Sequence, residues 1–336
     1  MKKTNKYSGL IILIITVLVL YFALKDDFIE KLRYIFSFDI KWLLFAIILM
    51  FTYWFLKSLV IYYCTKKFDS KYTLKKSIKL ILDTQFVNAV TPFSTGGQPY
   101  QIYRLKKQGI SLEQGTNIVI QDFIVYQIAL IILGTIAVIT NNILGFFPND
   151  DLLKKLVLIG YLINLFVIVG LFIVAFNRKG NKIILNIAIK AGAKLKIIKD
   201  KEQFLNKSNE IISDFHNNAV VLMKSKWHFI KIIMLNFIAL SSLYLIPFTL
   251  IMGLGESINP FIAIVTSAYV MLIGSFVPIP GGSGGLEFGF VRFFGFFISG
   301  AKLSSIMIVW RLITYYLGLI IGAVSVGINE EEETWE

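Results

Sequence analysis

Long apolar runs separated by short lysine-rich stretches dominate this chain. The hydrocarbon core of a bilayer is about 30 Å thick, so a helix that rises about 1.5 Å per residue crosses it in about 20 apolar residues. Six runs are of this kind: residues 8–24, 43–64, 116–140, 156–176, 229–253 and 303–328. The pattern predicts an all-α polytopic membrane protein, with residues 1–336 forming one integral membrane domain.

The first of these runs resembles a signal peptide, because three lysines precede its apolar core. It passes directly into Lys25, Asp26 and Asp27 without a small-residue cleavage site. We therefore expect an uncleaved membrane anchor.

Two other apolar regions are interrupted by proline and glycine, at residues 72–109 and 259–300. A helix break frees backbone N–H and C=O groups, and these cannot face lipid unpaired. The first region begins and ends beside lysines, which indicates a hairpin that enters from the cytoplasmic side. The second follows a span that ends outside, which indicates a hairpin that enters from the opposite side. If residues 259–277 crossed the membrane completely, the two regions would not be hairpins that enter from opposite sides.

The two interrupted regions carry the same motif. A shift of 188 residues places Pro92 over Pro280 and Arg104 over Arg292, within the shared pattern P-x-x-[ST]-G-G-x-x-[aromatic]-x-[apolar]-x-R. Glycine-rich breaks also recur in membrane proteins by compositional bias, so a chance match is the alternative. Broken helices in corresponding positions of two halves are typical of transporters with a binding site near the bilayer midplane. The sequence thus predicts two re-entrant hairpins related as an inverted repeat.

Charge and composition place the chain in a cell membrane. Hydrophobic residues make up 56% of the sequence and the mean hydropathy is +0.70, which excludes an ordinary soluble protein. The 34 basic residues exceed the 21 acidic ones, and they cluster at residues 1–7, 65–79 and 177–227. The positive-inside rule then places both termini in the cytoplasm.

Residues 177–227 combine lysines with apolar residues at helical spacing, so we expect an amphipathic segment on the anionic inner leaflet, or a regulatory or partner-binding one. No nucleic-acid partner is expected.

Few residues are available for metal or redox chemistry. The chain has one cysteine, Cys64, and two histidines, His216 and His228. We expect no disulfide, no metal site and no cofactor.

The helix ends in the two motifs are suited to binding an anion. A helix that starts at a break directs free N–H groups and the positive end of its dipole towards the bilayer centre. Glycine allows close backbone approach, and serine or threonine can donate to an oxygen. A phosphate headgroup fits these donors. We expect the headgroup to contact Thr91, Pro92, Ser94, Thr95, Gly96, Gly97, Gln98, Gln101, Arg104, Pro280, Gly281, Gly282, Ser283, Gly284, Gly285, Glu287, Arg292 and Arg311.

Arginine is rare in this chain, with five residues against 29 lysines, yet Arg104, Arg292 and Arg311 lie in or beside the interrupted regions. A guanidinium binds phosphate in a bidentate manner, whereas lysine is a point charge. The alternative is that these arginines pair with acids of the chain itself. Lys57 is expected to extend its ammonium towards the interface.

The acids available for such pairing are Asp83, Asp122 and Glu287, which lie in apolar surroundings where an unpaired charge costs a few kcal/mol. They are candidates for coupling or gating. Glu287 could instead cap the start of its helix.

Residues 91–101 (TPFSTGGQPYQ), residues 278–287 (PIPGGSGGLE) and Arg311 with Tyr315 and Tyr316 resemble the flippase-like transmembrane domain of lysylphosphatidylglycerol synthases. This is the membrane half of the multiple peptide resistance factors. The resemblance extends over nearly the whole chain and implies a membrane domain that exports aminoacylated phosphatidylglycerol. We expect a stand-alone form without the soluble synthase domain, which leaves the lipid open.

The leading hypothesis is therefore a lipid translocase for an anionic or aminoacylated phospholipid or another lipid-phosphate, with a separate synthase or glycosyltransferase as a possible partner. The alternative is a membrane transferase, related to phosphatidylglycerol lysyltransferase or acting on polyprenyl-phosphate, or an accessory to one. A transporter of small solutes is a third hypothesis. No Walker motif is present, so a translocase would depend on a gradient, a partner or mass action.

Overall fold

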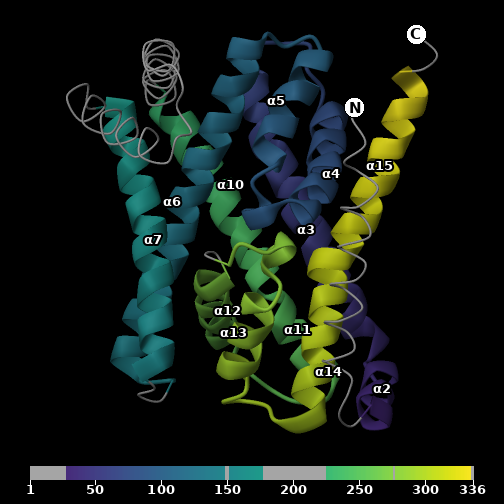
Figure 1. The fold of residues 1–336 in the computed structure, drawn as a ribbon, viewed down its shortest axis with the longest axis vertical. Coiled ribbons are helices and arrows are strands. Elements are labelled where there is room, and N and C mark those ends of the chain that lie inside the picture. The colour runs from purple at the N-terminus through teal and green to yellow at the C-terminus, as the bar shows by residue number, and fades with distance from the viewer. Residues whose placement is uncertain (1–27, 148–150, 177–224, 275–276, 334–336) are drawn as a thin grey trace, which may run out of the picture.

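The computed structural model describes residues 28–147, 151–176, 225–274 and 277–333. These residues form helices and connecting turns, with no strand among them (Figure 1). The predicted anchor at residues 8–24 and nearly all of the amphipathic segment at 177–227 lie outside the described residues.

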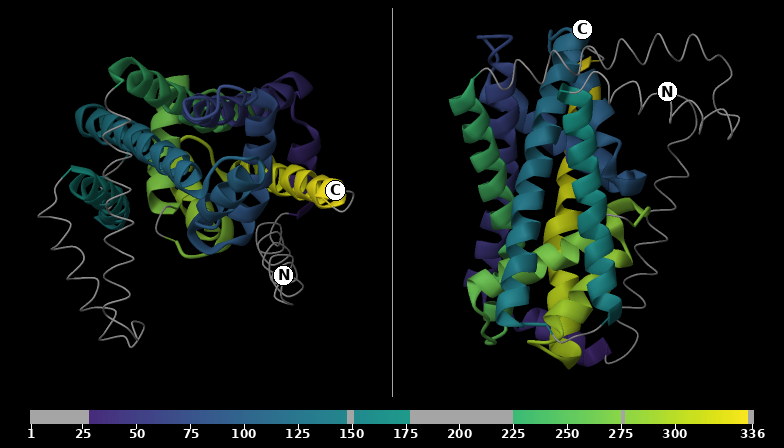
Figure 2. Two further views of the ribbon diagram at one scale, coloured as in Figure 1. Left: turned by 90° about the horizontal axis from the view of Figure 1, so that it is seen from above. Right: turned by 90° about the vertical axis from the view of Figure 1, so that its left-hand side faces the viewer.

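Five of the six predicted spans are confirmed. The sixth, the anchor at residues 8–24, lies outside the described residues. The chain is a multi-pass membrane protein, because five helices are long and apolar enough to cross a bilayer: Ile40–Thr65, Leu112–Leu144, Asp151–Ile173, Lys226–Gly253 and Gly300–Gly327. They belong to α3 (Ile40–Thr65), α6 (Leu112–Leu144), α7 (Asp151–Phe176), α10 with α11 (Lys226–Tyr244, Ile246–Gly253), and α14 with α15 (Gly300–Arg311, Leu317–Glu333). Figure 2 shows α6 and α7 running side by side, with α7 at the edge of the bundle.

Two of these spans are less regular than the sequence predicted. Pro247 lies in the first turn of α11, where its missing N–H is tolerated, and α10 ends just before it. Between α14 and α15 the chain makes a π-helical turn, η3 (Leu312–Tyr316). Such turns are rare and occur often at functional sites. A short amphipathic helix, α2 (Phe28–Phe36), was not predicted and packs against α14.

The two interrupted regions form hairpins that end inside the bundle. The first consists of α4 (Leu74–Val90), the turn η1 (Pro92–Ser94) and α5 (Gly97–Lys107); the second consists of α12 (Pro260–Gly274), the turn η2 (Pro280–Gly282) and α13 (Gly285–Phe294). With 15 residues, α12 is only about 22 Å long at about 1.5 Å per residue, too short to cross. The hairpins enter from opposite ends, and η1 contacts η2 (Figure 1).

Glycines permit the closest contacts between the long helices and the hairpins. A Cβ atom at Gly160 of α7 would lie 2.1 Å from the carbonyl oxygen of Leu272 on α12. A Cβ atom at Gly322 of α15 would lie 2.6 Å from the backbone nitrogen of Phe86 on α4. Since backbone atoms meet at both places, the helices are as close as their main chains allow.

We predict that Gly160→Ala destabilises the protein by about 1–3 kcal/mol, because a methyl group would overlap a backbone carbonyl that cannot move independently. The matched control is Gly170→Ala on the same helix, where a Cβ atom meets nothing within 4 Å. That substitution should stabilise the protein or leave it unchanged, because alanine is the better helix former by about 1 kcal/mol. Thermal unfolding of both purified variants in detergent measures the difference. Equal effects would show that α7 and α12 are not in close contact.

Candidate functional site

The turns of the two hairpins begin with nearly the same backbone conformation. Thr91 and Ile279 are extended, with φ/ψ of −112°/143° and −107°/142°. The residues after each proline, Phe93 and Gly281, have φ/ψ of 52°/12° and 65°/12°. The next residues, Ser94 and Gly282, have φ of 53° and 63°. The matching positions are related by the offset of 188 residues in the sequence, and the conformations differ from the next residue on, where Thr95 has φ/ψ of −88°/−11° and Ser283 of −58°/142°.

The first turn is the more strained of the two, because Phe93 and Ser94 adopt the left-handed conformation without being glycine. Each such residue costs of the order of 1–3 kcal/mol and persists only where its surroundings impose it. The sequence did not reveal this strain. The glycines of the first motif serve close packing instead: a Cβ atom at Gly96 would lie 2.5 Å from Thr91 Cγ2, and one at Gly97 would lie 2.1 Å from Asn88 Oδ1.

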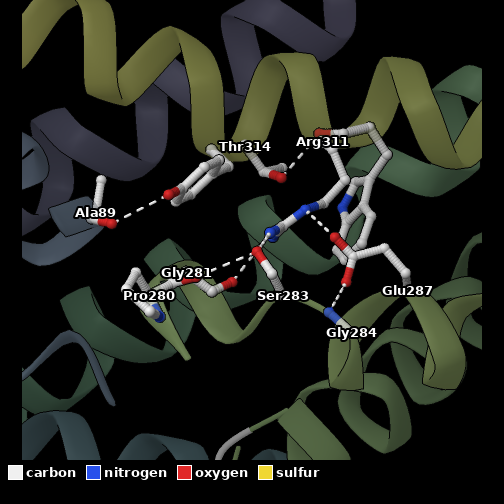
Figure 3. Close-up of polar contacts among 10 residues, drawn as sticks. Ala89, Pro280, Gly281, Ser283, Gly284, Glu287, Arg311 and Thr314 are labelled. Atoms are coloured by element: carbon white, nitrogen blue, oxygen red, sulfur yellow. Dashed lines mark hydrogen bonds and ion pairs between the residues drawn. The ribbon is translucent and has the colours of Figure 1, made fainter. Parts of the chain in front are cut away.

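Arg311, at the end of α14, is the centre of a polar cluster at the second turn (Figure 3). Its side chain is buried, and its Nε lies 2.8 Å from Glu287 Oε1. Its Nη2 donates to the carbonyl oxygen of Gly281 and to Ser283 Oγ, at 3.1 Å each. Glu287 in turn accepts a hydrogen bond of 2.7 Å from the backbone N–H of Gly284, so it caps α13 as well as pairing with Arg311. Both structural roles expected for these residues, helix capping and internal pairing, are confirmed.

Tyr315 connects this cluster to the first hairpin. Its ring lies 4.7 Å from the Arg311 guanidinium, and its hydroxyl donates a hydrogen bond of 3.0 Å to the carbonyl oxygen of Ala89. Ala89 is in the last turn of α4, where carbonyl groups lack partners within the helix. A Cβ atom at Gly281 would lie 2.2 Å from the Tyr315 ring, so that position requires glycine. Tyr315 of the π-helical turn thus contacts both hairpins, at the end of α4 and at the second turn. Tyr315 was not among the predicted site residues.

A second charged cluster lies between α4, α5 and α15. Arg104 Nε is 3.5 Å from Asp83 Oδ2, and the Tyr100 hydroxyl is 3.4 Å from the same oxygen. Ser325 of α15 donates to Asp83 Oδ1 at 2.5 Å. Asp83 is fully buried. The alternative that Arg104 pairs with an acid of the chain is confirmed here, and the cluster attaches the first hairpin to the last helix.

A third cluster lies between α3, α6 and α10. The Lys57 ammonium is 2.5 Å from Asp122 Oδ1 and 3.0 Å from Asn236 Oδ1, and both Lys57 and Asp122 are about 8% exposed. The expectation that Lys57 reaches towards the interface was wrong. A buried carboxylate and amide hold its ammonium, and burial without partners would cost several kcal/mol.

Comparison with known proteins agrees with this architecture. The sequence profile of the family described as "Lysylphosphatidylglycerol synthase TM region" matches residues 9–322. The chain belongs to this family. A "UPF0104 membrane protein" of Archaeoglobus fulgidus is 23% identical over 292 residues, which cover 86% of this chain and 87% of the relative. Membership of the family is compatible with a lipid-related function in the membrane.

The structure brings most of the predicted site residues of this family member to the two adjoining turns. Thr91 Oγ1 accepts from the N–H of Gly96 at 3.1 Å, and Thr95 Oγ1 donates to the carbonyl oxygen of Pro92 at 3.0 Å, so both threonines brace the first turn. Arg104 and Arg292 are exceptions: Arg104 is buried against Asp83, and Arg292 is exposed and lies over the Phe288 ring at 5.5 Å rather than at the Arg311 cluster. Pro92 and Ser94 lie in the first turn, and Pro280 and Gly282 lie in the second. The helices that follow begin with Gly97 and Gln98 and with Gly285, and Gln101 is buried further along α5.

Gly281→Ala tests the contact between the second turn and Tyr315. Gly145→Ala is the matched control, since Gly145 has a φ of 61° against 65° for Gly281 but has nothing within 4 Å of its Cβ position. Both alanines suffer the left-handed backbone, which costs about 1–2 kcal/mol. We expect Gly281→Ala to cost about 1–3 kcal/mol more, because its methyl group overlaps the ring. The measurement is the midpoint of thermal unfolding of each variant. Equal midpoints would mean that Tyr315 does not pack on the turn.

Proposed function

We propose that this protein is a flippase-like lipid translocase that moves an anionic phospholipid or other lipid-phosphate between the leaflets of the cell membrane. The observation that carries the proposal is the buried guanidinium of Arg311, which lies where the two helix breaks meet. Free backbone groups, a guanidinium and small residues are brought together there inside an otherwise apolar bundle.

The Glu287 carboxylate indicates the kind of ligand that suits this place. It bridges the Arg311 guanidinium and the backbone N–H of Gly284 at the start of α13. A guanidinium together with the amide at a helix N-terminus is the donor set that binds phosphate in many proteins. In our proposal a headgroup phosphate replaces Glu287 at these donors, and Glu287 returns when the lipid leaves. The acyl chains remain in the surrounding lipid.

The arrangement of the hairpins favours transport over catalysis. In our proposal they form an inverted repeat that exposes the Arg311 cluster alternately to the two sides of the membrane. Catalysis of a transfer reaction would need a nucleophile and a base near the headgroup. The charged side chains at the second turn, Arg311 and Glu287, are instead paired with each other.

We place the lysine-rich end of the bundle in the cytoplasm. The end of α5 and the loop from α3 to α4 lie at this end, which carries Lys66, Lys67, Lys71, Lys75, Lys76, Lys106 and Lys107. An excess of lysine and arginine in the loops is typical of the cytoplasmic side, and anionic lipid headgroups concentrate there.

The test is the movement of fluorescent phosphatidylglycerol, labelled on an acyl chain, in liposomes that contain the purified protein. An impermeant reductant added outside removes the signal of the outer leaflet. Wild-type protein should allow more than the outer-leaflet half to be lost, and should move phosphatidylglycerol faster than a zwitterionic lipid. No movement of any lipid-phosphate would contradict the proposal and favour the transferase or accessory hypothesis.

Arg311→Lys should slow this movement about 10- to 100-fold, because it keeps the charge but removes a charge-assisted hydrogen bond that contributes about 1.5–3 kcal/mol. Arg33→Lys makes the same chemical change at an exposed residue of α2 and should leave the rate unchanged. Size-exclusion chromatography checks that both variants are folded. An Arg311→Lys variant as fast as the wild type would exclude the guanidinium as the headgroup ligand.

A further inference from the structure

The cluster of Lys57, Asp122 and Asn236 takes no part in the contacts at the hairpin turns. Lys57 lies eight residues before the end of α3, and Asp122 lies ten residues after the start of α6, so both are about 12–15 Å from the lysine-rich end of the bundle. The position of Asn236 in α10 is equivalent, ten residues after its start. An ion pair at this depth lies well inside the bundle, and it is not needed to close a helix break.

The polar groups of this cluster are fixed by bonds to the backbone and to each other. Asn236 Nδ2 donates to the carbonyl oxygen of Ile232 at 3.1 Å, which leaves its Oδ1 to accept from Lys57. The Lys57 ammonium also lies 5.2 Å from the Tyr126 ring. Beside Asp122, the buried Oε1 of Gln121 accepts no hydrogen bond from the described residues. The site therefore holds one cation that is bound by one carboxylate and one amide oxygen.

The other titratable groups close to Asp122 and Lys57 are phenols and one thiol. Tyr53 and Cys64 on α3 and Tyr126 on α6 lie within electrostatic range of Asp122, and Tyr244 of α10 lies near the two tyrosines. Phenols and thiols are uncharged at physiological pH, so of these groups only Lys57 and Asp122 carry charge. The other helices on α6 bring further titratable residues: Tyr100, Tyr103, Arg104, Lys106 and Lys107 on α5; Asp151, Lys154, Lys155 and Tyr161 on α7; and Tyr269 on α12.

Electroneutrality then links a proton to an anion at this site. Protonation of the Asp122 carboxylate gives a neutral acid and leaves the Lys57 ammonium without a counter-charge in a medium of low dielectric constant. A headgroup phosphate that carries one negative charge restores neutrality if, at a stage of transport separate from its binding at Arg311, it takes the place of the carboxylate beside Lys57. When the phosphate leaves, Asp122 releases its proton and the ion pair forms again. One proton is bound and released for each negative charge, and Lys57 keeps its own proton throughout.

We propose that Asp122 and Lys57 form a proton-linked anion site, at which the translocase binds one proton together with each anionic headgroup and moves both in the same direction. This inference rests on the proposed function and names the energy source of the translocation, a pH gradient. Contact between α3 and the last helix provides a connection to the hairpins, since Trp54, one turn before Lys57, lies 3.3 Å from the Cβ position of Gly318, just after η3. Transport of one proton with one negative charge is electrically neutral, so a pH gradient should drive it and a membrane potential should not.

The experiment measures the ratio of fluorescent phosphatidylglycerol between the two leaflets of proteoliposomes under an imposed pH gradient. With one proton per lipid, a gradient of about one pH unit is equivalent to about 1.4 kcal/mol and should shift the steady-state ratio about tenfold, with accumulation in the leaflet facing the alkaline side. A potassium diffusion potential at equal pH should leave the ratio unchanged.

Three variants separate coupling from folding. Asp122→Asn should abolish the pH-driven shift. The double variant Lys57→Met with Asp122→Leu should fold, because replacing both members of a buried pair by apolar residues is often neutral, and it too should show no shift. Glu256→Gln, which removes the acid of the partly exposed Glu256–Lys302 pair, is the matched control and should keep the wild-type response.

The outcomes distinguish the two proposals. Wild-type lipid movement with a ratio that ignores the pH gradient would overturn the proton-linked site and leave the translocase proposal intact. A pH-driven shift that survives in Asp122→Asn would likewise overturn the assignment to Asp122. Absence of lipid movement in the wild type under every gradient would overturn both.

Discussion

The constraint on which this structure depends is the need to pair backbone groups where a helix breaks inside the membrane. In hydrocarbon an unpaired N–H or C=O group costs several kcal/mol, so a re-entrant hairpin is stable only if protein covers its turn. The two turns of this protein contact one another, and a few side chains bind the freed groups. Tyr315 donates to the carbonyl oxygen of Ala89, Arg311 donates to that of Gly281, and Glu287 accepts from the N–H of Gly284. The same polar groups that stabilise the breaks form the candidate anion site.

The last membrane helix is the element to which both hairpins are attached. Arg311 binds the second turn, Tyr315 in the π-helical turn reaches the first, and Ser325 further along donates to Asp83 in α4. One helix is therefore in contact with both hairpins. The charges are balanced locally in the same way, since Arg104, Lys57 and Arg311 each lie beside a carboxylate. Such pairs are costly to break by loss of one partner, but a ligand of the same charge can take the partner's place.

The spans and both hairpins were predictable because apolar length and proline or glycine breaks are local properties of the sequence. The ion pairs between side chains were predictable only as a set of alternatives, because they depend on which helices lie side by side. Arg104 and Arg292 occupy equivalent positions in the repeat, yet Arg104 is buried against Asp83 and Arg292 is exposed. The position equivalent to Asp83 in the second hairpin is Met271, so Arg292 has no corresponding acid on α12. The burial of Lys57 and the π-helical turn had no local signal, because both arise from contacts between distant helices.

The most direct test of this account is the side of the membrane from which each hairpin enters. In a background of Cys64→Ser, single cysteines at Lys71, exposed before the first hairpin, and at Ser257, exposed before the second, can be treated in intact cells with a thiol reagent that does not cross membranes. The account predicts that the cysteine at Ser257 reacts at once and that the one at Lys71 reacts only after the membrane is opened. If both cysteines react from the same side, the hairpins do not meet from opposite faces, and the account of their shared polar centre is contradicted.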